Sequence, residues 1–93
     1  MGYEIKYHPA VKEKDLPLIG QDIKKRIQKV ISVKLMTRPE IFGIPLRYSF
    51  YGLRKIRIGD YRLIYEMQKS IIFVYSIGHR SIVYRDLLRR YEN

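Results

Sequence analysis

Hydrophobic and polar positions follow strand periodicity at the start of the chain and helical periodicity after it. Tyr3 to Tyr7 alternates apolar and charged residues, which predicts a strand that ends before Pro9. Residues from Pro9 to Leu16 suit a short helix that Pro17 ends. From Gln21 to about Met36 the apolar residues recur at helical spacing, so we predict the main amphipathic helix there.

The second half of the chain reads mostly as strands. After a loop at 42–45 we expect an extended segment around Leu46 to Phe50. Two further strands, Leu53 to Ile58 and Tyr61 to Met67, are separated by Gly59 and Asp60, a connection that suits a tight hairpin of the II′ kind. The apolar run from Ile71 to Ile77 predicts a central strand buried on both faces.

A last helix follows, which Ser81 can cap and in which Val83, Leu87 and Tyr91 share a face. The predicted order is βααβββα, a single α+β domain over residues 1–93. We expect a small antiparallel sheet with the two N-terminal helices on one face, a C-terminal helix, and a partly open face that can hold a site.

The strong excess of positive charge indicates which kinds of molecule the protein can bind. Nineteen Lys and Arg against nine Asp and Glu give a formal net charge of +10 in 93 residues, so polyanions are the natural ligands. The sequence has no apolar stretch of the roughly 20 residues that span a bilayer and no signal-peptide core, so we expect a cytoplasmic protein with no membrane partner. The absence of cysteine excludes thiolate chemistry, and the sequence shows no metal-ligand cluster or phosphate loop, so no metal or cofactor is expected.

Several cations fall where the predicted strands bring them together. Lys55 and Arg57 share one face of their strand, and Arg62 begins the next strand of the hairpin. Arg80 follows the central strand, and Tyr84 lies about one turn into the last helix. Each alone reads as an ordinary solvated side chain. Together they repel one another unless an anion neutralises them, which indicates a phosphate site.

Such a site suits RNA, which carries its own nucleophile in the 2′-hydroxyl. A group that deprotonates this hydroxyl, beside cations that stabilise the charged phosphorane, can cleave RNA without a metal. Lys55 is one candidate base, since neighbouring positive charge favours its neutral form. His79 is the other, because imidazole titrates near neutral pH. A pairing of His79 with His8 is not required by the spacing.

The hairpin motif and the segment after the central strand resemble the RelE branch of the RelE/ParE toxin superfamily. The resemblance covers nearly the whole chain and is carried by Gly59-Asp60-Tyr61-Arg62-Leu63-Ile64-Tyr65, Gly78-His79-Arg80 and Val83-Tyr84. It implies a RelE-like, microbial-ribonuclease-like fold and the toxin of a type II toxin–antitoxin pair. Such a toxin enters the ribosomal A site and cuts mRNA there, leaving a 2′,3′-cyclic phosphate and inhibiting translation.

The resemblance also assigns roles. Lys55 falls on a lysine linked to proton abstraction, Arg57 on a second basic position, and Arg62 and Arg80 on phosphate-stabilising arginines. Tyr84 matches a tyrosine that stacks on or orients the substrate base. Position 57 is Arg where the best-known branch has Lys, and His79 stands where that branch has another cation. The glutamate base of a sister branch has no counterpart in Ile44-Pro45-Leu46.

Further contacts and partners complete the expectation. Lys24, Lys25 and Lys29 on the main helix read either as a solvated face or as a grip on RNA phosphates, and we expect Arg54 and Tyr61 to contact RNA as well. The resemblance implies a RelB-like antitoxin as the cognate partner, ribosome and mRNA as targets, and operator DNA only through the antitoxin. Two alternatives stay open: a ParE-like poison of DNA gyrase, and a non-catalytic RNA-binding module.

Overall fold

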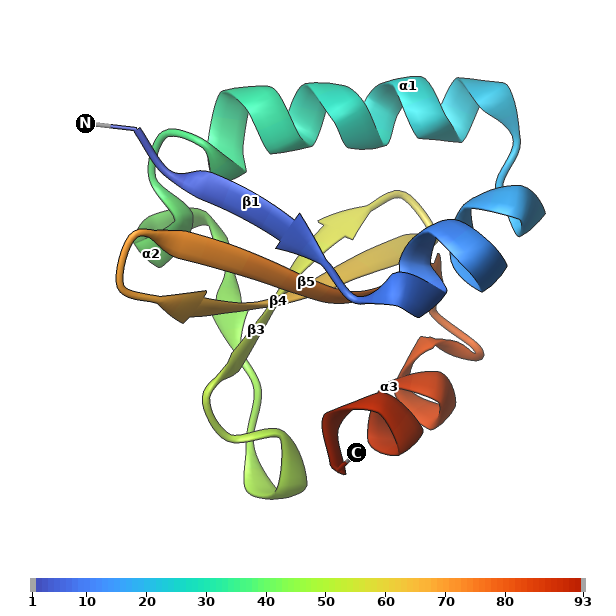
Figure 1. The fold of residues 1–93 in the computed structure, drawn as a ribbon. Helices are drawn as coiled ribbons and strands as arrows, with labels where there is room; N and C mark the ends of the chain where they lie inside the picture. Colours follow the sequence, from blue (N-terminus) through green and yellow to red (C-terminus); the bar gives the residue numbers. More distant parts are fainter. Residues whose placement is uncertain (1, 93) are drawn as a thin grey trace.

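A five-stranded sheet organises the chain (Figure 1). The computed structural model describes residues 2–92, and the strands lie in the order β1-β5-β4-β3-β2. Their bounds are Glu4–Tyr7 for β1, Ile44–Pro45 for β2, Leu53–Ile58 for β3, Tyr61–Gln68 for β4 and Ile71–His79 for β5. The expected α+β class is confirmed.

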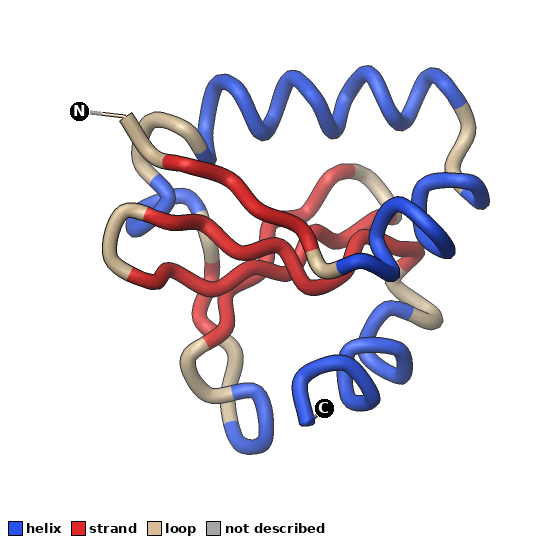
Figure 2. The backbone as a smooth tube through the Cα atoms, in the orientation of Figure 1, coloured by secondary structure: helices blue, strands red, loops and turns tan. Residues whose placement is uncertain are grey.

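Helices and helical turns cover both faces of this sheet (Figure 2). Before β2 they are η1 Val11–Asp15, η2 Leu16–Leu18, α1 Gln21–Val30, η3 Ile31–Leu35 and α2 Pro39–Phe42; after it come η4 Tyr48–Phe50 and α3 Val83–Glu92. The predicted main helix is confirmed, since α1 and η3 run on from one another. Within the described residues, no helix is long and apolar enough to cross a membrane.

The direction of β1 differs from expectation. β1 pairs in parallel with β5, from Glu4 opposite Ile71 to Tyr7 opposite Val74. The other neighbouring strands are antiparallel, so the sheet is mixed and the expectation of a wholly antiparallel sheet is wrong for this strand. The partner of β1 lies more than sixty residues further along the chain, and the alternation within β1 carries no information about its direction.

Two hydrophobic clusters lie on opposite faces of the sheet. On one face Ile27 of α1 and Leu35 of η3 pack with Ile56 and Leu63. The N-terminal turns join them through Val11 and Ile19, so both N-terminal helices cover this face as predicted. On the other face α3 buries the side chains of Leu53, Ile64, Val83 and Leu87. We call these the α1 face and the α3 face.

The β3–β4 hairpin confirms the prediction made for its turn. Ile58 pairs with Tyr61, which leaves Gly59 and Asp60 as a two-residue connection. Gly59 has φ +61°, and Asp60 is not among the residues with positive φ. A positive φ at the first position alone is the mark of a II′ turn, and glycine adopts it without steric cost.

The extended segment expected around Leu46 to Phe50 is wrong. The short strand β2 comes earlier, at Ile44–Pro45, and Tyr48–Phe50 forms a 3₁₀ turn instead. A backbone bond from Leu46 N to Leu53 O, 2.9 Å, closes the loop between β2 and β3. Because that contact depends on β3 lying alongside, local sequence does not reveal it.

A β-bulge interrupts β5. Ile64 of β4 faces Ser76 while the next residue, Tyr65, faces Val74, so Tyr75 is an extra residue on β5. Alternation therefore restarts after Tyr75, and Ile77 is buried on the same face as Val74. The prediction that this strand is buried on both faces holds only in part, since Phe73 and Tyr75 are half-buried.

Candidate functional site

Lys55 and Arg57 extend from the α3 face of β3. Leu53, two residues earlier, is buried under α3, whereas Ile56 and Ile58 between and after the cations are buried in the cluster of the α1 face. The predicted common face of the two cations therefore exists. Lys55 is half-buried next to α3, and Arg57, two residues further along β3, is exposed.

Arg57 and Arg62 stand directly opposite each other across the hairpin. Both side chains reach the turn: Arg57 Nε donates to Gly59 O at 3.4 Å, and Arg62 Nη1 donates to the same oxygen at 3.0 Å and to Tyr61 O at 2.9 Å. Within residues 2–92 neither guanidinium forms an ion pair with a carboxylate. Like charges directly opposite each other are unfavourable, so this pair favours an anion.

Lys55 and Tyr84 also meet. Lys55 Nζ lies 6.0 Å from the centre of the Tyr84 ring, within cation–π range. The ring of Phe50 lies 6.4 Å on from Tyr84, so an aromatic row begins next to the lysine. A cation on β3 and a ring on α3, far apart in sequence, are thus brought to one place.

Arg80 follows β5 and lies beside the turn of the β3–β4 hairpin. Its backbone N–H donates to Asp60 O at 2.8 Å, and its Nε lies 3.9 Å from Asp60 Oδ1. The two side chains are 65% and 70% exposed, so this ion pair is weak and Arg80 is available to another anion. Arg80 is thus a third arginine near the Arg57–Arg62 pair.

His79 lies apart from these cations. Gly78 faces Arg62, so alternation puts His79 on the α1 face, where it faces Tyr61 in register. The two rings make an edge contact at 5.6 Å, and His79 Nδ1 lies 2.8 Å from Ser81 Oγ and accepts from Ser81 N at 3.2 Å. The structure thus separates His79 from Lys55, and the Ser81 hydroxyl expected to cap α3 is engaged by His79.

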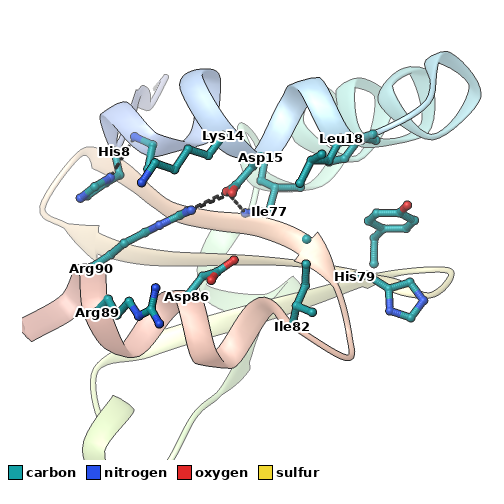
Figure 3. Close-up of a pocket in the computed structure, with 14 residues that line it drawn as sticks. His8, Lys14, Asp15, Leu18, Ile77, His79, Ile82, Asp86, Arg89 and Arg90 are labelled. Carbon is teal, nitrogen blue, oxygen red and sulfur yellow. Dashed lines mark hydrogen bonds and ion pairs between the residues drawn. The ribbon is translucent and has the colours of Figure 1, made fainter.

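A cavity of about 470 Å³ opens beside His79, along the part of β5 that β1 leaves unpaired, between the N-terminal turns and α3. Figure 3 shows His8 and His79 at opposite ends of this cavity with Asp15 and Arg90 between them, so the two histidines do not pair. His8 Nδ1 accepts from Ala10 N at 3.1 Å. Burial, and then the Arg90 charge, lower the pKa of His8 from its usual range.

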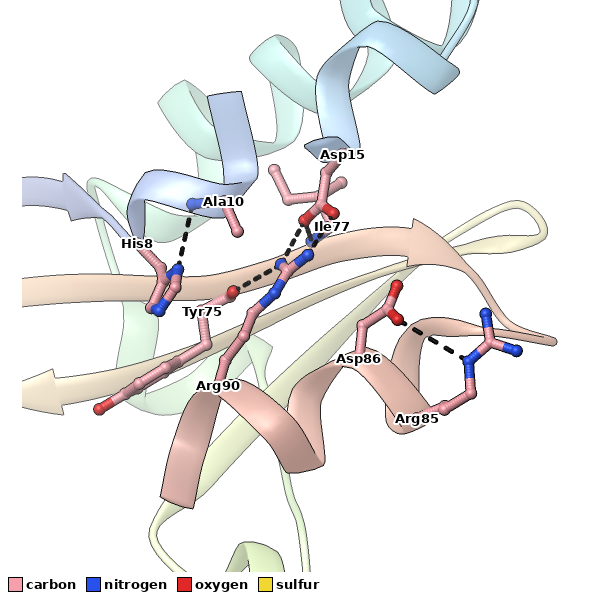
Figure 4. Close-up of polar contacts among 8 residues, drawn as sticks. All are labelled: His8, Ala10, Asp15, Tyr75, Ile77, Arg85, Asp86 and Arg90. Carbon is pink, nitrogen blue, oxygen red and sulfur yellow. Dashed lines mark hydrogen bonds and ion pairs between the residues drawn. The ribbon is translucent and has the colours of Figure 1, made fainter. Parts of the chain in front are cut away.

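A buried ion pair joins Asp15 and Arg90, two of the residues that line the cavity (Figure 4). Arg90 donates to both carboxylate oxygens of Asp15 at 2.7 Å, and the side chains are 8% and 6% exposed. Arg90 Nη1 also donates to Tyr75 O at 3.0 Å, and Asp15 Oδ2 accepts from Ile77 N at 2.9 Å. These backbone groups lie at the bulge of β5, beyond Val74, the last residue of β5 that pairs with β1. The ion pair therefore supplies the hydrogen-bond partners that no neighbouring strand provides there.

The cations of α1 lie in a different layer. Lys25 and Lys29 are exposed and Lys24 is half-buried on the helix that covers the α1 face (Figure 1). Lys29 does line a hollow of about 400 Å³ with Arg57 of the hairpin, and Arg26 and Lys34 complete its positive charge. Sequence reasoning missed these two, although Arg26 lies three residues before Lys29 on α1 and Lys34 lies five residues after it in η3.

Arg54 and Tyr61, the two other residues predicted to contact RNA, both interact with neighbouring residues of the fold. The Arg54 guanidinium donates to Gly43 O at 2.7 Å, and Tyr61 packs against the α1-face cluster and His79. No group of three His, Asp or Glu side chains among the described residues is arranged to hold a metal ion. The chemistry available on the α3 face is therefore that of cations and a stacked aromatic ring.

Comparisons with known proteins agree on one family. The family model described as the ParE toxin of the type II toxin–antitoxin system parDE matches residues 5–84. The curated protein Toxin RelE of Mycobacterium tuberculosis is 30% identical over 84 residues, which cover 85% of this chain and 87% of that protein.

Solved structures share the fold. The toxin–antitoxin complex RelBE2 of Mycobacterium tuberculosis contains a chain with a TM-score of 0.77 and 23% identity, and the match covers 86% of this chain and 100% of that one. A mutant of the E. coli toxin RelE in the free state has a TM-score of 0.76 and 24% identity, with 97% and 98% of the two chains covered.

Proposed function

This chain belongs to the family of RelE-like and ParE-like toxins of type II toxin–antitoxin systems, and we propose that it is an endoribonuclease that cuts mRNA in the ribosomal A site. The observation that carries the proposal is the facing pair of Arg57 and Arg62, which no carboxylate among the described residues neutralises, next to Lys55 and Tyr84. Its cytoplasmic location follows from that target.

The proposed reaction needs no metal. The Lys55 amine takes the proton of the 2′-hydroxyl, and the resulting oxyanion attacks the adjacent phosphorus. Arg57 and Arg62 donate to the phosphorane oxygens as charge develops on them, and Arg80 adds to this beside the hairpin turn. The bond from phosphorus to the 5′-oxygen breaks, that oxygen takes a proton from water, and a 2′,3′-cyclic phosphate is left.

Tyr84 and the remaining cations hold the substrate in this scheme. The Tyr84 ring stacks on a base beside the scissile phosphate, and the Lys55 amine above the ring is thereby placed next to the ribose. Lys24, Lys25 and Lys29 contact RNA phosphates without sequence choice. The position of His79 on the opposite face favours Lys55 as the base.

A RelB-like antitoxin is the proposed partner that holds the toxin inactive. An acidic or amphipathic segment laid over the cationic α3 face neutralises it and blocks entry to the ribosome. The similarity to a chain in a toxin–antitoxin complex supports such a partner, through which the toxin also reaches operator DNA.

A ParE-like action on DNA gyrase is the second candidate, because the matching family model is described by ParE. The two candidates need different surfaces. A gyrase poison has no use for Lys55 placed against Tyr84, whereas an mRNA endonuclease loses its base and its stacking ring without them.

The test is cleavage in a translating extract, with mRNA 5′ ends mapped by primer extension. Lys55→Ala and Arg62→Ala should lower the cleavage rate by about 10²-fold or more, the usual contribution of a positioned base or charge stabiliser. Lys6→Ala removes one exposed positive charge from β1, which β5 and β4 separate from β3 in the sheet, and should leave the rate nearly unchanged. His79→Gln tests the rival base and should retain cleavage.

Two results would overturn the proposal. Intact mRNA together with blocked supercoiling by gyrase would replace it with the ParE-like action. Cleavage that survives Lys55→Ala and disappears in His79→Gln would move the base to the other face of the sheet.

A further inference from the structure

Two tyrosines of the loop between β2 and β3 are almost fully exposed. Tyr48 is 91% exposed and Tyr51 is 82% exposed. Rings of this size usually contribute to stability by burial, and the described structure makes no such use of either ring. Large exposed aromatic side chains in one short loop point to a ligand.

The backbone of Tyr48 supports that view. Its φ is +57°, in the left-handed region that disfavours any residue with a Cβ. Glycine fits such a position without strain, so an aromatic residue here is retained at a cost to the fold. Residues in strained conformations cluster at ligand-binding sites.

The loop holds these rings in place. Phe50 N donates to Arg47 O at 3.2 Å and Tyr51 N donates to Tyr48 O at 3.0 Å. The Phe50 side chain packs into the α3-face cluster, and the Tyr91 hydroxyl donates to Tyr51 O at 3.2 Å. A loop fixed by these contacts loses little conformational entropy on binding.

The exposed rings continue the candidate site. Phe50, between them in sequence, contacts the Tyr84 ring at 6.4 Å, and Tyr84 in turn lies under Lys55. The loop also carries the exposed cation Arg47. Nearby Glu66 accepts hydrogen bonds from Tyr75 and Gln68 and so is already engaged.

A hollow lies against one of the two rings. It has a volume of about 380 Å³ and is lined by Tyr51, Leu46, Arg54 and Met67 among others. That volume falls at the lower end of sites that hold small organic ligands, roughly 300–1,000 Å³. Arg54 and Met67 extend toward the α1 face and the Arg54 guanidinium already donates to Gly43 O, so the hollow offers mainly an apolar surface beside the Tyr51 ring.

We propose that Tyr48 and Tyr51 stack on bases of single-stranded RNA next to the nucleotide held at Tyr84, so that the loop is a second stacking subsite. The inference rests on the proposed function, because it is the RNA substrate that runs on from Tyr84. Surrounding cations favour a nucleic acid over an apolar protein segment, and base stacking on tyrosine is tolerant of sequence.

The test measures RNA binding without cleavage. The probe is a short fluorescent single-stranded RNA with every 2′-hydroxyl methylated, which removes the nucleophile, and affinity is read by anisotropy. Tyr48→Gly and Tyr51→Ala should each weaken binding by about 5-fold to 150-fold, the loss typical of one stacked base. Tyr51→Phe keeps the ring and should bind nearly as the unaltered chain does.

The glycine substitution separates binding from folding. Tyr48→Gly relieves the left-handed backbone, so its urea midpoint should rise while its RNA affinity falls. A loss of affinity that came from unfolding would lower both. Unchanged affinity in Tyr48→Gly and Tyr51→Ala would overturn the proposal.

Cleavage in the translating extract keeps the two ideas distinguishable. If the unaltered chain cuts mRNA and the ring variants bind RNA normally, the subsite is refuted and the proposed function stands. If the unaltered chain cuts nothing and the ring variants lose RNA affinity, the subsite stands and the proposed cleavage fails. Loss of antitoxin binding with RNA affinity intact would refute the subsite and make the loop a protein-docking surface.

Discussion

Removing the carboxylate of Asp15 should strongly destabilise the protein. The substitution Asp15→Ala leaves the Arg90 guanidinium, whose side chain is 8% exposed, without its anion, and leaves Ile77 N without an acceptor. Breaking one side of a buried ion pair costs about 3–5 kcal/mol. A domain of this size has a free energy of unfolding of about 5–15 kcal/mol, so a large fraction of it should be lost.

The assay is urea denaturation followed by far-ultraviolet circular dichroism. The matched control is Arg85→Ala, because Arg85 forms an ion pair with Asp86 at 3.8 Å while its own side chain is 67% exposed. That exposed pair should contribute no more than about 1 kcal/mol. Thermal midpoints should differ accordingly, by about 4–8 °C for each kcal/mol.

A double-mutant cycle with Arg90→Ala isolates the interaction. The double variant has no buried charge, so it should be less destabilised than the sum of the two single variants. The reasoning is refuted if Asp15→Ala costs no more than Arg85→Ala. Additive effects in the cycle would show that the two side chains do not act together at the β5 edge.

Three further predictions concern the fold and its charge. Burial lowers the pKa of His8 in the folded protein, so as the pH falls below about 6.5 this histidine is protonated more readily in the unfolded chain than in the folded one. The folded protein should therefore lose stability as the pH falls through that range. The urea midpoint should fall less in the variant His8→Gln. Gly43→Ala would place a Cβ against Tyr65 Oη, so we expect the free energy of unfolding measured in urea to fall by about 1–3 kcal/mol, and unchanged stability would contradict the contact. Replacing both Arg26 and Lys34 by alanine should make RNA binding less sensitive to salt: the slope of log affinity against log salt concentration should become shallower by about 0.7 for each cation removed. An unchanged slope in an anisotropy titration would show that the hollow lined by these cations holds no phosphate.

Sequence alone determined the features that depend on neighbours along the chain. The amphipathic helix from Gln21, the hairpin turn at Gly59 and the common face of Lys55 and Arg57 follow from periodicity and from the steric freedom of glycine. The resemblance in the hairpin motif also identified the toxin family, because that motif is a contiguous run of residues.

Tertiary structure decided what depends on residues far apart. The parallel pairing of β1 joins segments more than sixty residues apart, and alternation in one strand does not specify a partner or its direction. The bulge at Tyr75 restarts the alternation of β5 and fixes His79 on the face away from Lys55. Asp15 and Arg90 are 75 positions apart in the sequence. They meet at the part of β5 that does not pair with β1, where the backbone N–H and C=O groups need hydrogen-bond partners from side chains.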